Sequence, residues 1–134
     1  MSDRKRILLI DDEKDFCFFM GRNLEQTGEF EVMTASQGRE GINLAREKNP
    51  DLILLDINMP QMSGPEIAEI LFHDQRTKHI PVIFLTAVVT REEVGIEAIK
   101  KIGGRSFIAK PVDTGKLAGC IKSVLNEKKE SVEI

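Results

Sequence analysis

The hydrophobic positions along the chain form short apolar runs separated by stretches with a helical period. Three runs are apolar at nearly every position: Ile7 to Ile10, Leu52 to Leu55 and Val82 to Leu85. Phe30 to Ala35 and Ser106 to Ala109 are shorter or more mixed. A parallel strand that is covered on both sides is apolar on both faces. The pattern therefore predicts three central strands and two edge strands.

Between these runs, apolar residues recur three or four positions apart, which is typical of helices packed on one face. The strongest sets are Phe16, Met20 and Leu24; Ile67, Ile70 and Leu71; Val94, Ala98 and Ile102; and Leu117, Cys120, Ile121 and Val124. A weaker helix is expected over Gln37 to Lys48, and the pairs Ser63 with Glu66 and Thr90 with Glu93 fit capping boxes at two helix starts. Five alternating strands and helices predict an α/β fold of the (βα)5 type, with right-handed crossovers and helices on both faces.

Composition limits the classes of function. The 134 residues suit one domain, which we expect to span 1–125 with a short charged tail over 126–134. A formal net charge of -3 argues against direct binding to nucleic acid, and no apolar stretch reaches the length of a membrane span. A cytoplasmic protein is expected. There Cys17 and Cys120 are expected to be buried reduced thiols, although a redox-sensitive pair is the alternative.

Polar residues follow the predicted strands where each one ends. They are Asp11, Asp12 and Glu13 after the first strand, Asp56 after the third, Thr86 and Ala87 after the fourth, and Lys110 and Pro111 after the fifth. The carboxyl ends of parallel strands share one edge of the sheet, so these side chains should meet there. Carboxylates brought together repel, and a hard cation such as Mg²⁺ would neutralise them and accept phosphate oxygens. Glu13 is interpreted as a solvated helix-start residue.

Four motifs in this order carry a family resemblance. They are LLIDDE at the first strand end, DLILLDINMPQMSG around Asp56, FLTA at the fourth strand end and FIAKP at the fifth. Over Lys5 to Leu125 the chain resembles the CheY-like receiver domain of bacterial response regulators. The resemblance implies a flavodoxin-like doubly wound sandwich with a five-stranded parallel sheet in the order 2-1-3-4-5.

The resemblance also implies the role of each residue at the acidic site. Asp56 is the expected phosphoryl acceptor. Asp12 is expected to ligate Mg²⁺ directly, Asp11 to help hold it through water, and the main-chain carbonyl of Asn58 to complete the protein ligands. Lys110 is expected to contact the phosphoryl group.

By the same resemblance, Thr86 donates its hydroxyl to the phosphoryl group, Ala87 leaves room for it, and Phe107 moves inward as Thr86 shifts. The peptide bond between Lys110 and Pro111 is expected to be cis. A sensor histidine kinase or a histidine phosphotransfer protein would be the donor. The fourth helix, fifth strand and fifth helix would signal to a partner protein. The chain is then not an enzyme beyond self-catalysed phosphotransfer and autodephosphorylation, and a monomer is favoured.

Three alternatives stay open at this point. A haloacid-dehalogenase-like phosphatase also uses Asp, Thr, Lys and Mg²⁺, but it needs an acid or base two residues after the nucleophile, where this chain has Asn58. An interaction module that works without phosphorylation would keep the fold and not the chemistry. A receiver excised from a larger regulator or hybrid kinase would have a similar sequence.

Overall fold

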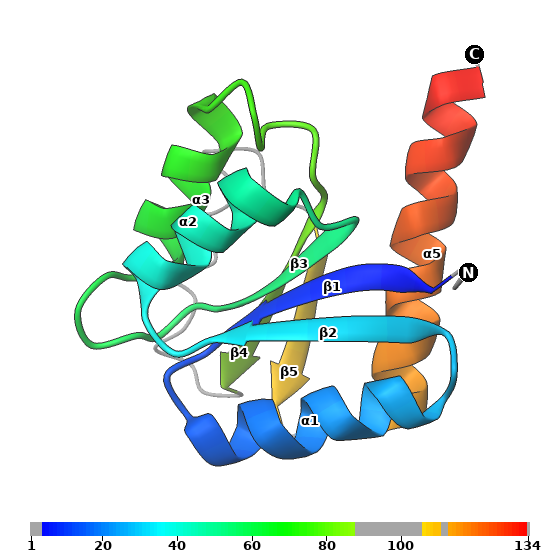
Figure 1. Cartoon of the computed structure of the whole chain (residues 1–134), viewed down its shortest axis with the longest axis horizontal. Coiled ribbons are helices and arrows are strands. Elements are labelled where there is room, and N and C mark those ends of the chain that lie inside the picture. The colour runs from blue at the N-terminus through cyan, green and yellow to red at the C-terminus, as the bar shows by residue number, and fades with distance from the viewer. Residues whose placement is uncertain (1–3, 88–105, 111–112, 134) are drawn as a thin grey trace.

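The computed structural model describes residues 4–87, 106–110 and 113–133, with side chains in the last helix described to Asn126. Strands and helices alternate along it as far as β4, and β5 and α5 are the next described elements (Figure 1). They are β1 Lys5–Ile10, α1 Lys14–Gln26, β2 Phe30–Ala35, α2 Gly38–Lys48, β3 Leu52–Asp56, α3 Gly64–His73, β4 Val82–Ala87, β5 Ser106–Lys110 and α5 Thr114–Glu133. The helix expected around Val94, Ala98 and Ile102 lies outside the described residues, and so does its capping box.

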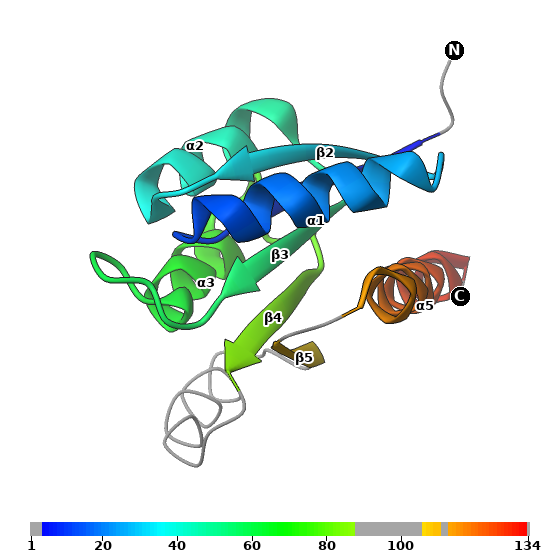
Figure 2. The same ribbon diagram turned by 90° about the horizontal axis from the view of Figure 1, so that it is seen from below.

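The five strands form one sheet in the order β2-β1-β3-β4-β5, and every neighbouring pair is parallel. This confirms the predicted fold class, with β2 and β5 as the edge strands. Figure 2 shows the arrowheads of β2, β3 and β4 on the same edge of the sheet. The polar residues that follow the strands therefore gather at that edge.

The alternation of side chains along the central strands divides the core into two layers. Ile7 and Leu9 of β1 join the cluster that includes Leu24 of α1 and Leu117 of α5. Leu8 and Ile10 join the opposite cluster, with residues of α2 and α3 such as Ile42 and Ile67. All four β1 residues in these clusters are completely buried. This explains why the central strands are apolar at every position, since both of their faces meet helices.

Local signals fix the start of α3 and the length of α5. The Ser63 hydroxyl accepts from the Glu66 main chain, and the Glu66 carboxylate accepts from the Ser63 main chain, so the predicted capping box is confirmed. The last helix continues to Glu133, through the segment interpreted as a charged tail, and projects beyond the sheet (Figure 1). Glu and Lys, which fill this segment, favour helix without needing a buried face.

The two cysteines lie in the same core layer. Cys17 of α1 is buried in the cluster that includes residues of β1 and β3, and Cys120 of α5 is half-buried against the same cluster. No disulfide joins them in the described part of the chain.

Among the described helices, none combines the length and apolar character needed to cross a bilayer.

Candidate functional site

The sheet register brings Asp11 and Asp56 together. Ile10 and Leu55 are the last paired residues of β1 and β3, and the two aspartates come one position later in each chain segment. The main chain still follows the neighbouring strands at this point. The Asp11 N–H donates to the Ala35 carbonyl at 3.0 Å, and the Ile57 N–H donates to the Leu85 carbonyl at 3.0 Å. Both aspartates are therefore held by ordered strand backbone.

Asp12 completes a cluster of three carboxylates. One carboxylate oxygen from each of Asp11, Asp12 and Asp56 lies within 4.8 Å of the others. Asp11 is completely buried and Asp56 is 5% exposed, whereas Asp12 is the most accessible. Two charges at such a distance repel by about 3 kcal/mol at an effective dielectric constant near 20. The donors are all oxygens, which suits a hard divalent cation better than a thiolate- or imidazole-seeking metal.

The turn into α1 fixes the orientation of Asp11. Its carboxylate oxygen Oδ1 accepts a hydrogen bond from the Glu13 main chain at 2.9 Å. The Cys17 thiol, one turn into the helix, donates to the Asp11 carbonyl at 3.2 Å. Sequence reasoning assigned Cys17 only to the core. An apolar helix position six residues after an aspartate carries no signal of this contact, because the contact depends on the path of the turn.

The loop after β3 forms one wall beside the acidic cluster. It leaves the strand at Ile57 and closes when the Gly64 N–H donates to the Ile57 carbonyl at 2.9 Å. Asn58 is exposed at the start of this loop. A small cavity of about 170 Å³ lies between the loop and Asp12, and Met59 and Met62 contribute to its lining. The acidic cluster is therefore reached from solvent on the Asp12 side.

The strand register also orders the remaining predicted site residues. Thr86 and Ala87 are the last two residues of β4, and they pair with Ala109 and Lys110 of β5. Their main chain therefore reaches the same edge as Asp56, which pairs with Leu85. Phe107 pairs with Phe84 further back along the strands. The structure describes the main chain of these four predicted residues and not their side chains, and Pro111 lies outside the described residues.

Comparison with known proteins identifies the class to which this fold and site belong. The family model of the response regulator receiver domain matches residues 7–122. The chain belongs to the response regulator receiver domain family. This family membership favours the receiver interpretation over the phosphatase alternative.

Individual relatives agree over nearly the whole chain. The polar-differentiation response regulator DivK of Brucella ovis is 33% identical over 123 residues, which are 92% of this chain and 98% of that protein. A CheY-like response regulator receiver domain protein from Methanospirillum hungatei superposes with a TM-score of 0.86 at 28% identity, covering 96% of this chain and 99% of that chain. The receiver domain of a signal transduction histidine kinase from Syntrophus aciditrophicus gives a TM-score of 0.81 at 28% identity, covering 92% and 91%.

Proposed function

We propose that this chain accepts a phosphoryl group on Asp56 and passes the signal to another protein. The observation that carries the proposal is the position of Asp56, 5% exposed at the end of β3, with carboxylate oxygens of Asp11 and Asp12 within 4.8 Å. Burying one charged aspartate side chain costs free energy, and placing further carboxylates beside it raises that cost. Such a site is useful where a bound cation offsets the charge of the carboxylates and of the phosphoryl group that is transferred to one of them.

The proposed metal is Mg²⁺, and the donor set fits it. Asp12, Asp11, Asp56 and the main-chain carbonyl of Asn58 would hold it, leaving positions for water and phosphoryl oxygens. When bound, Mg²⁺ would supply positive charge that stabilises the transferring phosphoryl oxygens.

The remaining chemistry belongs to the side chains. A carboxylate oxygen of Asp56 attacks the phosphorus of a phosphohistidine in line, so a new O–P bond forms as the N–P bond breaks. The released imidazole nitrogen takes a proton from solvent. The Lys110 ammonium pairs with the developing negative charge, and the Thr86 hydroxyl donates to a phosphoryl oxygen. Later attack of water on the acyl phosphate returns the Asp56 carboxylate and inorganic phosphate, without turnover of any other substrate.

The signal is a change of surface. The product places nearly two negative charges where there was one, which draws Thr86 toward the phosphoryl group and lets Phe107 turn inward. The surface formed by the helix expected between β4 and β5, together with β5 and α5, then binds a downstream protein. In this proposal residues 1–125 form a cytoplasmic receiver that works as a monomer, receives phosphate from a sensor histidine kinase or a phosphotransfer protein, and does not touch nucleic acid or membrane.

The test is incubation with acetyl phosphate and Mg²⁺, followed by intact-protein mass spectrometry. We expect one acid-labile phosphoryl adduct that is lost in Asp56→Asn and when Mg²⁺ is chelated. Asp15→Asn is the matched control, because Asp15 is an exposed aspartate near the start of α1 outside the cluster, and its adduct should equal that of the wild type. An adduct that persists in Asp56→Asn would sink the proposal. No adduct with any small donor would favour the phosphorylation-independent module.

A further inference from the structure

A second cavity lies at the opposite edge of the sheet from the aspartates. It measures about 470 Å³, which is within the range of small-molecule sites, roughly 300 to 1,000 Å³. It is open to solvent, and its walls are the start of β1, the turn between α1 and β2, and the outer part of α5. It is thus formed by segments far apart in the sequence, and no residue of the acidic cluster contributes to it.

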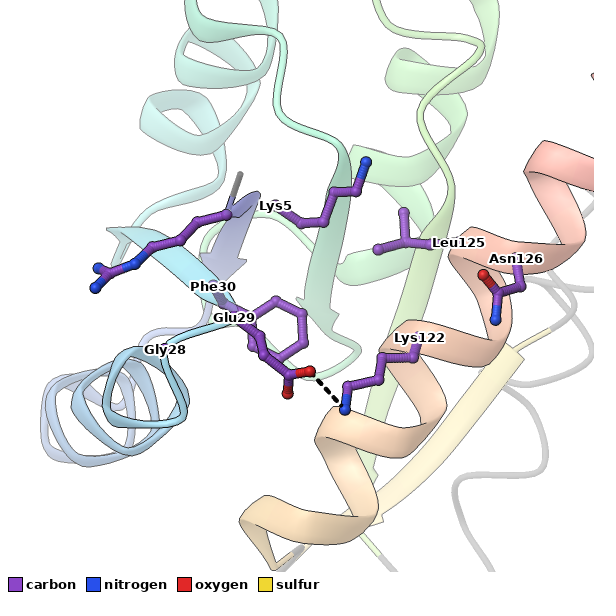
Figure 3. A pocket seen from close by; sticks show the side chains of 8 residues that line it. Lys5, Gly28, Glu29, Phe30, Lys122, Leu125 and Asn126 are labelled. Atoms are coloured by element: carbon purple, nitrogen blue, oxygen red, sulfur yellow. Dashed lines mark ion pairs between the residues drawn. The ribbon is translucent and has the colours of Figure 1, made fainter. Parts of the chain in front are cut away.

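Two apolar side chains form the body of this cavity. Phe30 is the first residue of β2 and is 1% exposed, so its ring is fixed in the core. Leu125 of α5 is half-buried and faces it across the cavity (Figure 3). Because Phe30 is already almost completely covered, it forms the floor of the cavity. A flat aromatic ring or a short aliphatic chain placed over it would bury mainly apolar surface of Leu125 and of the lysine stems in the lining, which favours binding.

The polar residues around this body are mostly cationic. Among the residues that the structure describes, Arg4, Lys5 and Lys122 line the cavity together with one carboxylate, that of Glu29. This excess of positive charge contrasts with the formal net charge of -3 for the whole chain. Asn126 adds a side-chain amide on the α5 side. The lining is therefore suited to an anionic group.

The ion pair at the cavity is exchangeable. The Lys122 ammonium lies 2.8 Å from a Glu29 carboxylate oxygen, and the two side chains are 50% and 47% exposed (Figure 3). Exposed pairs of this kind contribute little to stability. A ligand anion can replace Glu29 as the partner of Lys122 at small cost, while Lys5 lies on the other side of the cavity (Figure 3).

We propose that this cavity binds a small anionic amphiphile, a molecule with one carboxylate, sulfonate or phosphate group on an aromatic or short aliphatic body. The apolar body would lie over Phe30 and against Leu125 and the lysine stems, and the anion would contact the ammonium groups of Lys122 and Lys5. A flat polyanion would not fill the apolar part, and a neutral hydrocarbon would gain no contact with the cationic side chains. The site is independent of the Asp56 chemistry.

The probe pair that tests this is 1-anilinonaphthalene-8-sulfonate and its uncharged analogue N-phenyl-1-naphthylamine. Both have the same aromatic body, and only the first carries a sulfonate. We expect saturable fluorescence enhancement with the sulfonate at low salt, and at least tenfold weaker binding of the analogue. Amide chemical-shift changes should centre on Gly28, Leu125 and Asn126. Shifts confined to other residues, or no saturation below about 1 mM, would overturn the proposal.

Charge variants provide the second arm. Lys122→Met and Lys5→Gln keep much of each side chain's apolar length, and each should weaken sulfonate binding about tenfold, as expected for loss of a charged contact. Binding of the neutral analogue should not change. Two control variants should bind the sulfonate as the wild type does. One is Lys116→Gln, on the same helix outside the cavity. The other combines Phe18→Ser with Phe19→Ser and removes an exposed aromatic pair on α1. Unchanged sulfonate affinity in both cavity variants would refute the site.

Discussion

Gly64 leaves no room for a side chain beside Asp56, because a Cβ atom on it would lie 2.6 Å from the Asp56 carbonyl oxygen. The same atom would lie 2.7 Å from the Ile57 Cα. Both neighbours are main-chain atoms of the segment that holds the proposed phosphoryl acceptor, so neither can rotate away. The close approach of α3 to the end of β3 thus requires glycine at this position.

Gly64→Ala should therefore disturb both stability and chemistry. We expect the free energy of unfolding to fall by about 1 to 3 kcal/mol, the usual cost of overpacking. The rate of adduct formation with acetyl phosphate should also fall, because Asp56 is displaced relative to Asp11 and Asp12. Urea denaturation and the phosphorylation time course measure the two effects.

Gly119→Ala is the control for glycine replacement as such. Gly119 is an exposed residue of α5, and a Cβ atom there would meet nothing within 4 Å. Alanine should stabilise the helix by about 0.5 to 1 kcal/mol and leave adduct formation unchanged. If Gly64→Ala were as stable and as reactive as Gly119→Ala, the close approach of Gly64 to Asp56 would affect neither the free energy of unfolding nor the rate of adduct formation.

The acidic cluster predicts an unusual effect of removing a functional residue. Without Mg²⁺, Asp12→Asn should unfold at a higher temperature than the wild type, since it removes a repulsion worth on the order of 1 to 3 kcal/mol. Adding Mg²⁺ should raise the melting temperature of the wild type and leave that of Asp12→Asn nearly unchanged. Differential scanning fluorimetry with a Mg²⁺ titration measures both the melting temperatures without Mg²⁺ and their rise when Mg²⁺ is added. A variant that is less stable without metal, or that still responds to Mg²⁺, would contradict the arrangement.

The end of α2 provides a prediction about backbone strain. Asn49 has a φ of 47°, in the left-handed region, and its side-chain amide donates to the Arg76 carbonyl at 2.8 Å. Both Asn49→Gly and Asn49→Ala lose this bond and the contact of the Asn49 Oδ1 with the His79 ring nitrogen at 3.2 Å. Glycine suits the left-handed backbone, whereas alanine strains it. We expect Ala to be about 1 kcal/mol less stable than Gly in urea denaturation. Equal stabilities would show that the hydrogen bond alone matters.

The sequence predicts the sheet well because burial on both faces leaves a continuous apolar run. The convergence of Asp11, Asp12 and Asp56 was predictable for a related reason, since parallel strands deliver their carboxyl ends to one edge. These features depend on periodicity and on chain order. They need no knowledge of how the loops fold.

Other features depend on contacts that periodicity does not encode. The close approach of Gly64 to Asp56 depends on the path of the loop between β3 and α3. The contact of Arg46 with Asp74 joins residues 28 positions apart. The extension of α5 to Glu133 rests on local helix preference, because the apolar period ends near Val124.

Asp74 links α2 to the loop after α3 and makes the stability of this region depend on pH. Its carboxylate accepts from the Arg76 main chain at 2.8 Å and from the Arg76 side chain at 3.2 and 3.1 Å, and also from the Arg46 side chain at 2.7 Å. The Arg76 side-chain and main-chain hydrogen bonds, with that of Arg46, hold the pKa of the Asp74 carboxyl well below its ordinary value of 3.8. The charged form is therefore the one that stabilises the fold.

The pKa of Asp74 is lower in the folded than in the unfolded chain. The ionised Asp74 carboxylate therefore contributes fully to the stability of the fold above pH 3.8, and this contribution is lost as the pH falls from there toward the pKa of the folded chain. Asp74→Asn should melt at a lower temperature than the wild type at pH 7, and the gap should narrow below about pH 4. Glu47→Gln, which removes an exposed carboxylate of α2, should show no such narrowing. A gap between wild type and Asp74→Asn that stayed constant from pH 7 to pH 3 would mean that the ionised carboxylate is not what ties α2 to this loop.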